Sequence, residues 1–171
     1  MERLSEIIFL MDRLETYTIK KGCHYSGLHF SLTTSNELTA DVVFTESCIY
    51  TLDNPSKQAD VNKLLGLSDN YSHSWDSARI GWRYLDNKLE VLGYSRNDGQ
   101  HYSEHLAFVE LYKQYRFGVK ILPGEYQYTI DNQMISMKRT STYGGIRYLL
   151  YPYFGGESVA PHEIRIRMKH I

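Results

Sequence analysis

The stretch that decides the fold runs from Leu149 to Met168 and reads LLYPYFGGESVAPHEIRIRM. Its last part alternates Ile164, Ile166 and Met168 with charged residues. This is the pattern of a strand with one buried face and one solvent-exposed face. The alternation predicts a β-sheet protein, and the rest of the chain repeats it.

The first part of the same stretch, residues 148–153, is apolar on both faces and predicts a central strand that is covered on both sides. Gly155-Gly156 permits backbone angles that other residues avoid, which predicts a wide turn into the last strand. This turn either packs aromatic side chains beneath a loop or lines the mouth of a pocket with Tyr153, Phe154 and His162.

The period of two recurs at Leu28, Phe30 and Leu32, which are predicted to form the buried side of a strand. Short spacing between turn signals favours antiparallel hairpins. These signals are Asp53-Asn54-Pro55, Asp86-Asn87, Asn97-Asp98-Gly99, Pro123-Gly124, Asp131-Asn132 and Gly144-Gly145. The 15 Tyr and 6 Phe residues also suit pleated surfaces, where aromatic side chains pack across strands.

The pattern gives about eleven candidate strands, which are too many for a small barrel. We therefore expect an all-β fold: a two-sheet antiparallel sandwich, jelly-roll or concanavalin-like, in a single domain over residues 1–171. Apolar residues from Ile7 to Leu14 fall at helical spacing after Ser5, which predicts a short N-terminal helix in residues 1–16. A second short helical turn is predicted at residues 61–65.

Composition limits the function classes. The formal net charge of -1 favours neither nucleic acid nor an anionic membrane, so we expect no extended nucleic acid partner. Cys23 and Cys48 lack the spacing of a zinc site, so we expect free thiols, no metal and no cofactor. Asp12 and Arg13 interrupt the apolar N-terminal run, and no cleavage site follows. We therefore expect no secretion signal, no membrane span and a cytoplasmic location.

The segment HSWDSARIGWRY, His73 to Tyr84, predicts a strand with an unusual polar face. If the segment is extended, its alternate apolar residues enter the core, and one stripe remains on the other side. That stripe contains Ser77, Arg79, Gly81 and Arg83, with His73 and Trp75 at the same parity. Two guanidiniums on either side of a glycine leave a gap in which a ligand could approach the backbone.

An alternative is open for the same face. Arg79 and Arg83 can instead pair with carboxylates on neighbouring strands, such as Glu90 or Asp41, because such cross-strand pairs are common. The two alternatives predict different surroundings for the guanidiniums: a cleft in the first case and acidic side chains in the second.

Several histidines lie near polar and aromatic residues. His24 and His29 flank Tyr25-Ser26-Gly27, and His101 and His105 flank a similar triplet, but neither spacing converges on a metal along a strand. We expect solvated or hydrogen-bonded surface histidines. The His24-Tyr25-Ser26 cluster follows two lysines, and together with Lys63 and the two arginines it could form one basic patch.

Signatures of catalysis are mostly missing. The sequence contains no nucleophile elbow, phosphate-binding loop, zinc-protease motif or dinucleotide fingerprint. Strand carboxylates such as Glu90, Glu110 and Glu163 are isolated, which argues against the carboxylate pair of a glycosidase. A lyase-type elimination needs a tyrosine or histidine base beside an arginine that neutralises a uronate. Tyr25, His73 and Arg79 are the candidates for that chemistry.

Five segments, taken in order, resemble an uncharacterised family of proteins from Bacteroidota and their phages. They are YTIKKGCHYSG, DVNKLLGLSD, HSWDSARIGWRY, LEVLGYSRNDG and LLYPYFGGESVAPHEIRIRM, and they span most of residues 17–169. The resemblance implies a concanavalin-like jelly-roll of the kind found in lectins and polysaccharide-active proteins. It implies no particular activity.

From these observations we expect a non-enzymatic protein that binds a small anionic or sugar-containing ligand, namely a nucleotide or a sugar phosphate. A phage protein that sequesters a nucleotide signal would fit. The alternatives are a carbohydrate-binding or polysaccharide-lyase-like protein, and a structural or protein-interaction module that could form a homo-oligomer. The predicted ligand-binding residues are His24, Tyr25, Ser26, Lys63, His73, Ser77, Arg79, Arg83, Tyr153, Phe154 and His162.

Overall fold

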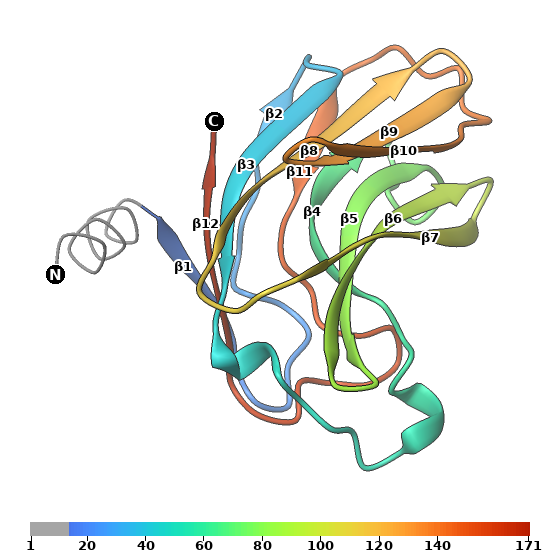
Figure 1. Ribbon diagram of the computed structural model, residues 1–171. Helices are drawn as coiled ribbons and strands as arrows, with labels where there is room; N and C mark the ends of the chain where they lie inside the picture. The colour runs from blue at the N-terminus through green and yellow to red at the C-terminus, as the bar shows by residue number, and fades with distance from the viewer. Residues whose placement is uncertain (1–13) are drawn as a thin grey trace, which may run out of the picture.

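The computed structural model describes residues 14–171 and consists of strands with two short 3-10 helices (Figure 1). The strands are β1 (Glu15–Ile19), β2 (Leu32–Thr33), β3 (Glu37–Phe44), β4 (Asn62–Ser68), β5 (Ser77–Leu85), β6 (Lys88–Asn97), β7 (Gln100–Val109), β8 (Gln114–Leu122), β9 (Glu125–Ile130), β10 (Gln133–Lys138), β11 (Arg147–Leu150) and β12 (Ile164–His170). The 3-10 helices are η1 (Glu46–Cys48) and η2 (Pro55–Lys57).

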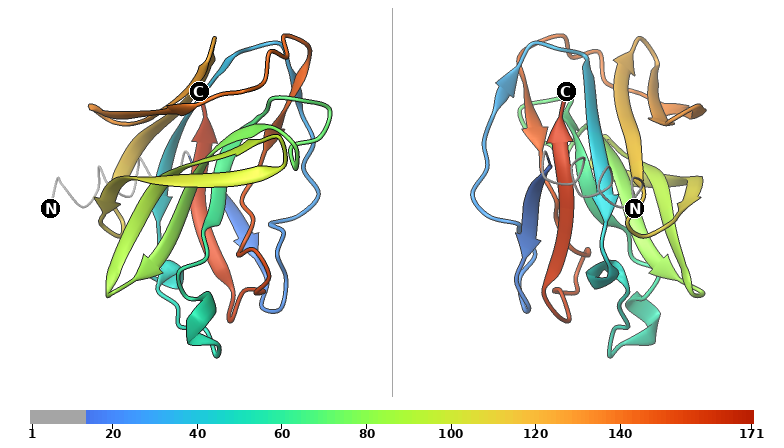
Figure 2. Two further views of the ribbon diagram at one scale, coloured as in Figure 1. Left: turned by 90° about the vertical axis from the view of Figure 1, so that its right-hand side faces the viewer. Right: turned by 60° about the vertical axis from the view of Figure 1, so that its left-hand side comes forward.

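The strands form two 6-stranded sheets. The first has the order β1-β12-β3-β8-β9-β10 and the second has the order β2-β11-β4-β5-β6-β7. All of their pairings are antiparallel. The two sheets lie face to face (Figures 1 and 2). The predicted all-β antiparallel sandwich is therefore confirmed.

The core fills the space between the sheets and follows the predicted alternation. Ile164, Ile166 and Met168 of β12 are fully buried in the first sheet. Ala78 and Ile80 of β5 are fully buried in the second sheet, together with Trp82 two positions further along the strand. The other side of β5 therefore points away from the core, as the sequence predicted.

Four of the six predicted turns are hairpin turns, whereas Asp53-Asn54-Pro55 and Gly144-Gly145 lie in connections between strands of different sheets. Asp86 and Asn87 join β5 to β6 with φ angles of 50° and 60°. Two consecutive positive φ angles are the geometry of a tight hairpin turn that matches the twist of its strands. Asp98-Gly99 joins β6 to β7 in the same way, with φ angles of 53° and 78°.

Two helix predictions have different outcomes. The predicted N-terminal helix lies mostly in residues 1–13, outside the described residues, and Glu15 and Thr16 begin strand β1 instead. The predicted helical turn at residues 61–65 is wrong, because residues 62–65 belong to β4. Every residue of β4 is buried, so its apolar residues do not alternate and resemble a helical run.

The prediction of a half-buried strand at Leu28, Phe30 and Leu32 is also wrong. All three side chains are exposed, and only Leu32 belongs to a strand, the two-residue β2. The segment runs as a loop along the edge of the second sheet, where the backbone N–H of Leu149 donates to the Ser31 carbonyl. No second layer covers this edge within residues 14–171, so the alternating apolar side chains stay outside the core.

A buried charge network joins the two sheets. Asp69, which follows β4, is fully buried and accepts hydrogen bonds from Arg139 at 2.6 and 2.8 Å and from Arg147 at 3.1 Å. The Tyr126 hydroxyl of β9 also donates to Asp69, at 2.8 Å. Because Tyr126 belongs to the first sheet and Arg147 to the second, one carboxylate connects the layers.

Three further observations concern residues 14–171. Cys23 is exposed and Cys48 is buried, and both are free thiols. No helix in this part of the chain is both long enough and apolar enough to cross a membrane. Nor do these residues contain a group of three His, Cys, Asp or Glu side chains placed to hold a metal ion.

Candidate functional site

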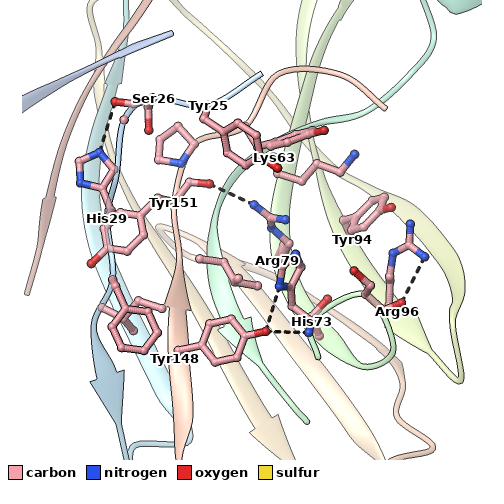
Figure 3. A pocket seen from close by; sticks show the side chains of 18 of the residues that line it. Tyr25, Ser26, His29, Lys63, His73, Arg79, Tyr94, Arg96, Tyr148 and Tyr151 are labelled. Carbon is pink, nitrogen blue, oxygen red and sulfur yellow. Dashed lines mark hydrogen bonds between the residues drawn. The ribbon is translucent and has the colours of Figure 1, made fainter. Parts of the chain in front are cut away.

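A cleft of about 420 Å³ lies on the outer face of the second sheet (Figure 3). It crosses the strands β11, β4, β5 and β6 and is bordered by the loop before β2. Its lining residues are Tyr25, Ser26, Gly27, His29, Phe30, Lys63, His73, Ser74, Ser77, Arg79, Tyr94, Arg96, residues 148–153, Gly155 and Gly156. The lining contains three cationic side chains and several aromatic rings, but no Asp or Glu.

Arg79 is the central cation of the cleft. Arg79 is 8% exposed, and its Nη2 donates to the Tyr151 carbonyl at 3.0 Å. The buried Nε atom has no hydrogen-bond partner. No carboxylate within residues 14–171 forms an ion pair with Arg79, Lys63 or Arg96. A buried cation without a counter-ion is costly, so this cleft favours an anionic ligand.

The local sequence explains where Arg79 points. Its position on β5 alternates with the core residues Ala78 and Ile80, so its side chain lies on the outer face. The facing residue on β4 is Gly66. An ideal Cβ on Gly66 would lie only 2.7 Å from the Arg79 Cγ atom. Because Gly66 has no side chain, the arginine can lie across β4 and reach the Tyr151 carbonyl.

Burial lowers the pKa of Arg79 to about 10, and Arg96 also lowers it, while nearby tyrosines raise it. The guanidinium therefore remains charged at neutral pH, but its charged form is less favourable than in water. An anion bound in the cleft would remove part of this cost.

Lys63 is the second buried cation and is also 8% exposed. Its Nζ donates to the Gly155 carbonyl at 3.1 Å and lies 4.8 Å from the centre of the Tyr94 ring and 5.8 Å from that of Tyr153. Burial is the largest cause that lowers the pKa of Lys63, to about 8, and the charge of Arg79 adds to it.

The backbone conformation at this contact explains the first of the two glycines. Gly155 has a φ angle of 69°, and an ideal Cβ there would lie 2.1 Å from the Ser158 carbonyl oxygen. Only glycine fits this conformation without strain. Its N–H donates to the Asn62 side chain at 2.5 Å, so the turn is anchored to β4 beside Lys63. The turn therefore does both things that the sequence left open: it packs aromatic residues and it lines the cleft.

A tyrosine and a histidine form a pair at another part of the cleft. The backbone N–H of His73 donates to the Tyr148 hydroxyl at 2.8 Å, and the same hydroxyl lies 2.9 Å from His73 Nδ1 (Figure 3). Burial and the charges of Arg79 and Arg96 lower the pKa of His73, so its imidazole is neutral at pH 7. A neutral imidazole can accept the proton of the hydroxyl.

Aromatic rings form the wall beside the β2 edge. His29 stacks on Tyr151 with 4.8 Å between ring centres, and Phe30 lies next to Tyr148 at 6.4 Å. The hydroxyl oxygens of Ser26 and Ser77 are buried at the cleft without a hydrogen-bond partner. The site thus combines flat apolar surfaces with unsatisfied polar groups.

The structure brings many of the predicted site residues together. Those that line the cleft are Tyr25, Ser26, Lys63, His73, Ser77, Arg79 and Tyr153. His24 lies behind the lining, where it stacks on Tyr153 and donates from Nδ1 to the Phe154 carbonyl at 2.9 Å.

Three predicted residues lie away from the cleft. Phe154 is fully buried in the core, and His162 donates to the Ser47 carbonyl at 2.8 Å. Arg83 pairs with Glu90 at 2.7 Å and donates to the Ala59 carbonyl. For Arg83 the cross-strand alternative is therefore the one observed, because Glu90 is its neighbour on β6.

The predicted ligand gap at Gly81 is absent. An ideal Cβ at Gly81 would lie 2.4 Å from Val61 Cγ1, so the Val61 side chain fills the space. Gly81 serves packing, and Gly66 is the glycine that shapes the cleft.

Most of the lining residues were not among the predicted ligand-binding residues. His29 was expected to be a solvated histidine, and Tyr94, Arg96, Tyr148 and Tyr151 were not predicted. Tyr94 and Arg96 share one parity on β6, and Tyr94 pairs directly with Arg79 of β5. The parity was readable from the sequence, but the pairing of the strands was not.

The fold is similar to those of solved polysaccharide-active proteins. The chain matches alginate lyase AlyC3 with a TM-score of 0.67 and 10% identity, over 94% of this chain and 75% of that chain. It matches a Bacteroides ovatus mixed linkage glucan GH16 protein with a TM-score of 0.53 and 8% identity, over 92% of this chain and 81% of that chain. LamAcat from Zobellia galactanivorans also matches, with a TM-score of 0.53 and 8% identity, over 82% of this chain and 64% of that chain.

At these identities the likeness shows a shared jelly-roll fold. No protein-family model and no curated protein sequence matches the chain. The resemblance to a Bacteroidota and phage family therefore remains a prediction.

These comparisons correct the main functional prediction. The solved proteins with this fold include an alginate lyase and GH16 glucanases, which act on carbohydrates, so the nucleotide or sugar-phosphate binder is the wrong reading. The carbohydrate alternative is the better supported one.

Proposed function

We propose that the cleft binds an acidic saccharide, with a uronate carboxylate on Arg79. The observation that carries this proposal is the buried Arg79 guanidinium, which has an unpartnered Nε and no carboxylate partner within residues 14–171. A guanidinium presents a fork of donors that matches a carboxylate. The ligand would supply the counter-ion that the described part of the protein does not.

The rest of the cleft supports a sugar as the carrier of that carboxylate. The aromatic rings of Phe30, Tyr148 and Tyr151 offer flat apolar surfaces, and the buried hydroxyls of Ser26 and Ser77 offer hydrogen bonds to sugar hydroxyls. The absence of acidic side chains from the lining avoids repulsion of a uronate. A solved structure of alginate lyase AlyC3, which shares the fold, holds dimannuronate.

Calorimetric titration tests the proposal. Mannuronate oligosaccharides should bind the protein, whereas neutral mannose oligosaccharides of equal length should bind at least about tenfold more weakly. Arg79→Gln should lose the difference, because a glutamine keeps a polar side chain without the charge.

Arg116→Gln is the matched control, since Arg116 is an exposed arginine of β8 that pairs with Asp41. It should bind as the unaltered protein does. Equal affinity for acidic and neutral oligosaccharides, or retention of the preference in Arg79→Gln, would reject the proposal.

A second candidate function, β-elimination of the bound polyuronate, is favoured by the Tyr148–His73 pair. In this reaction a base removes the proton from the ring carbon next to the carboxylate, and the bond to the leaving glycosidic oxygen breaks as a carbon–carbon double bond forms. Arg79 would neutralise the carboxylate and so make that proton more acidic. The Tyr148 oxygen, after passing its proton to His73, would take the carbon-bound proton, and the hydroxyl formed in this way would give that proton to the leaving glycosidic oxygen.

Ultraviolet absorbance of the unsaturated product tests this step. The unaltered protein should produce the absorbance from polymannuronate, and Tyr148→Phe should bind the polymer but not cleave it. Binding without any rise in absorbance would reject elimination and leave the binding proposal intact.

A further inference from the structure

Lys63 is unlike the other lysines of residues 14–171. It is the buried one, and it has no carboxylate partner in this part of the chain. By contrast, exposed lysines such as Lys113 and Lys120 pair with Glu110 and Glu37. A buried lysine that faces a cleft without a counter-ion is positioned for chemistry or ligand contact rather than for a surface ion pair.

The surroundings of Lys63 act on its amine in two directions. The rings of Tyr94 and Tyr153 lie close to Nζ and favour the ammonium form. Burial is the largest cause that disfavours it, the positive charges of Arg79 and Arg96 add to this effect, and Asp60 opposes it. The net result is a pKa of about 8, below the ordinary lysine value of 10.5. A substantial fraction of the side chain is therefore a free amine at mildly alkaline pH, and a free amine is a nucleophile.

Arg79 supplies a second group in the same cavity. Both side chains line the cleft (Figure 3), and the Arg79 Nε has a donor without a partner. A small molecule with a carboxylate and a carbonyl group could place the carboxylate at Arg79 and bring the carbonyl carbon to the Lys63 amine. Binding in this way holds the two reacting groups together and raises their effective concentration.

We propose that Lys63 forms an imine with aldehydes and ketones that carry a carboxylate. The neutral amine attacks the carbonyl carbon, a proton moves from nitrogen to oxygen to give a carbinolamine, and loss of one water molecule leaves a carbon–nitrogen double bond. No oxidant or reductant is consumed in this step. The inference goes beyond saccharide binding and does not depend on it.

Reductive trapping tests the proposal on the unaltered full chain. The protein is incubated at mildly alkaline pH with limiting succinic semialdehyde and cyanoborohydride, which reduces the imine to a stable secondary amine. Peptide mass spectrometry then gives the extent of labelling at each lysine. Butyraldehyde, which has the same number of carbons but no carboxylate, is the matched reagent.

The expected result has two parts. Lys63 should be labelled at least about tenfold faster than the exposed, paired Lys113, because more of its side chain is a free amine. Succinic semialdehyde should label Lys63 faster than butyraldehyde does, and Arg79→Gln should remove that preference.

Labelling of Lys63 no faster than Lys113 would overturn the proposal. Equal labelling of Lys63 by the two aldehydes would overturn it too, since it would remove the role of Arg79. Both readouts come from folded, unaltered protein, so neither depends on whether a Lys63 variant folds. Saccharide binding is measured separately, so a failure of one proposal is distinguishable from a failure of the other.

Discussion

Arg79 and Arg83 lie four positions apart on the same face of β5, yet their surroundings are opposite. Arg83 has Glu90 as a partner, and Arg79 has only the Tyr151 carbonyl. A residue that serves stability is expected to be paired in the free protein, whereas a residue that serves a ligand is left unpaired. The pairing of Arg83 with Glu90 indicates a structural role for Arg83, and the unpaired Arg79 agrees with the proposed ligand contact.

Substitution of each arginine by methionine measures that difference. Arg79→Met should raise the free energy of unfolding by about 1 kcal/mol, because it removes an unpaired buried charge. Arg83→Met should lower it by about 1–3 kcal/mol, because Glu90 loses a charged hydrogen bond. Urea unfolding of the two variants checks both values. Similar losses of stability in both variants would show that Arg79 is structural.

Glu90 makes stability depend on pH. Burial raises the pKa of Glu90, but hydrogen bonds from His105 and Arg83 outweigh it, and the net shift is below the ordinary value of 4.5. A carboxylate with a lowered pKa stabilises the fold above its ordinary pKa, and the contribution is lost as the pH falls through the folded-state pKa. The unaltered protein should therefore lose more stability on acidification to about pH 3 than Glu90→Gln does.

Urea unfolding midpoints, measured for both proteins at a series of pH values, check this expectation. Glu90→Gln should be the less stable protein at neutral pH, and the two curves should converge in acid. Parallel curves over the whole range would contradict it.

At the scale of single elements, the sequence predicted strands well where one face is buried. The alternation in β12 and the parity of β5 are both confirmed. Prediction failed for β4, which is buried on both faces and therefore has no alternation. It failed in the opposite sense at Leu28 and Phe30, where an alternating run forms an exposed edge loop. Alternation shows that the two faces of a strand differ in polarity, but it does not show whether a second layer covers the apolar face.

The turn between β11 and β12 is the element that fixes Lys63 in the cleft. Gly155→Ala should lower the free energy of unfolding by about 2–4 kcal/mol, because it combines a positive φ with an overlap against the Ser158 carbonyl. It should also weaken binding of acidic saccharides, since the Gly155 carbonyl accepts from Lys63. Chemical denaturation and calorimetry check the two effects.

Gly144→Ala is the control for the Gly155 change. No atom lies within 4 Å of an ideal Cβ at Gly144. The free energy of unfolding of the Gly144→Ala protein should stay within about 0.5 kcal/mol of that of the unaltered protein. A Gly155→Ala protein that behaved like this control would show that the turn tolerates a side chain.

At the scale of the whole molecule, the cleft is assembled from segments far apart in the chain. The edge loop near Tyr25, strands β4 to β6 and strand β11 meet only because β11 inserts between β2 and β4. Residue types and parity identified Arg79 and Lys63, but strand order decides which aromatic side chains stand beside them. This is why 7 of the 20 lining residues were predicted from the sequence and the others were not.

The connection between the two sheets gives the last prediction. Asp69 is fully buried and receives hydrogen bonds from Arg139, Arg147 and Tyr126. Asp69→Asn should lower the free energy of unfolding by about 3–5 kcal/mol, because two guanidiniums keep their charge while the shared anion is lost.

The urea midpoint should fall with an unchanged slope, since the surface exposed on unfolding stays the same. Asp131→Asn is the control, because Asp131 is an exposed turn residue with a φ of 47°, a conformation that asparagine tolerates, and the amide oxygen can still accept from the Arg116 N–H. If Asp69→Asn lowered the free energy of unfolding as little as this control does, the sheets would be held together by apolar packing alone. The expected large loss would instead show that one carboxylate specifies how the two layers face each other, and thereby holds the β11 side of the cleft in place.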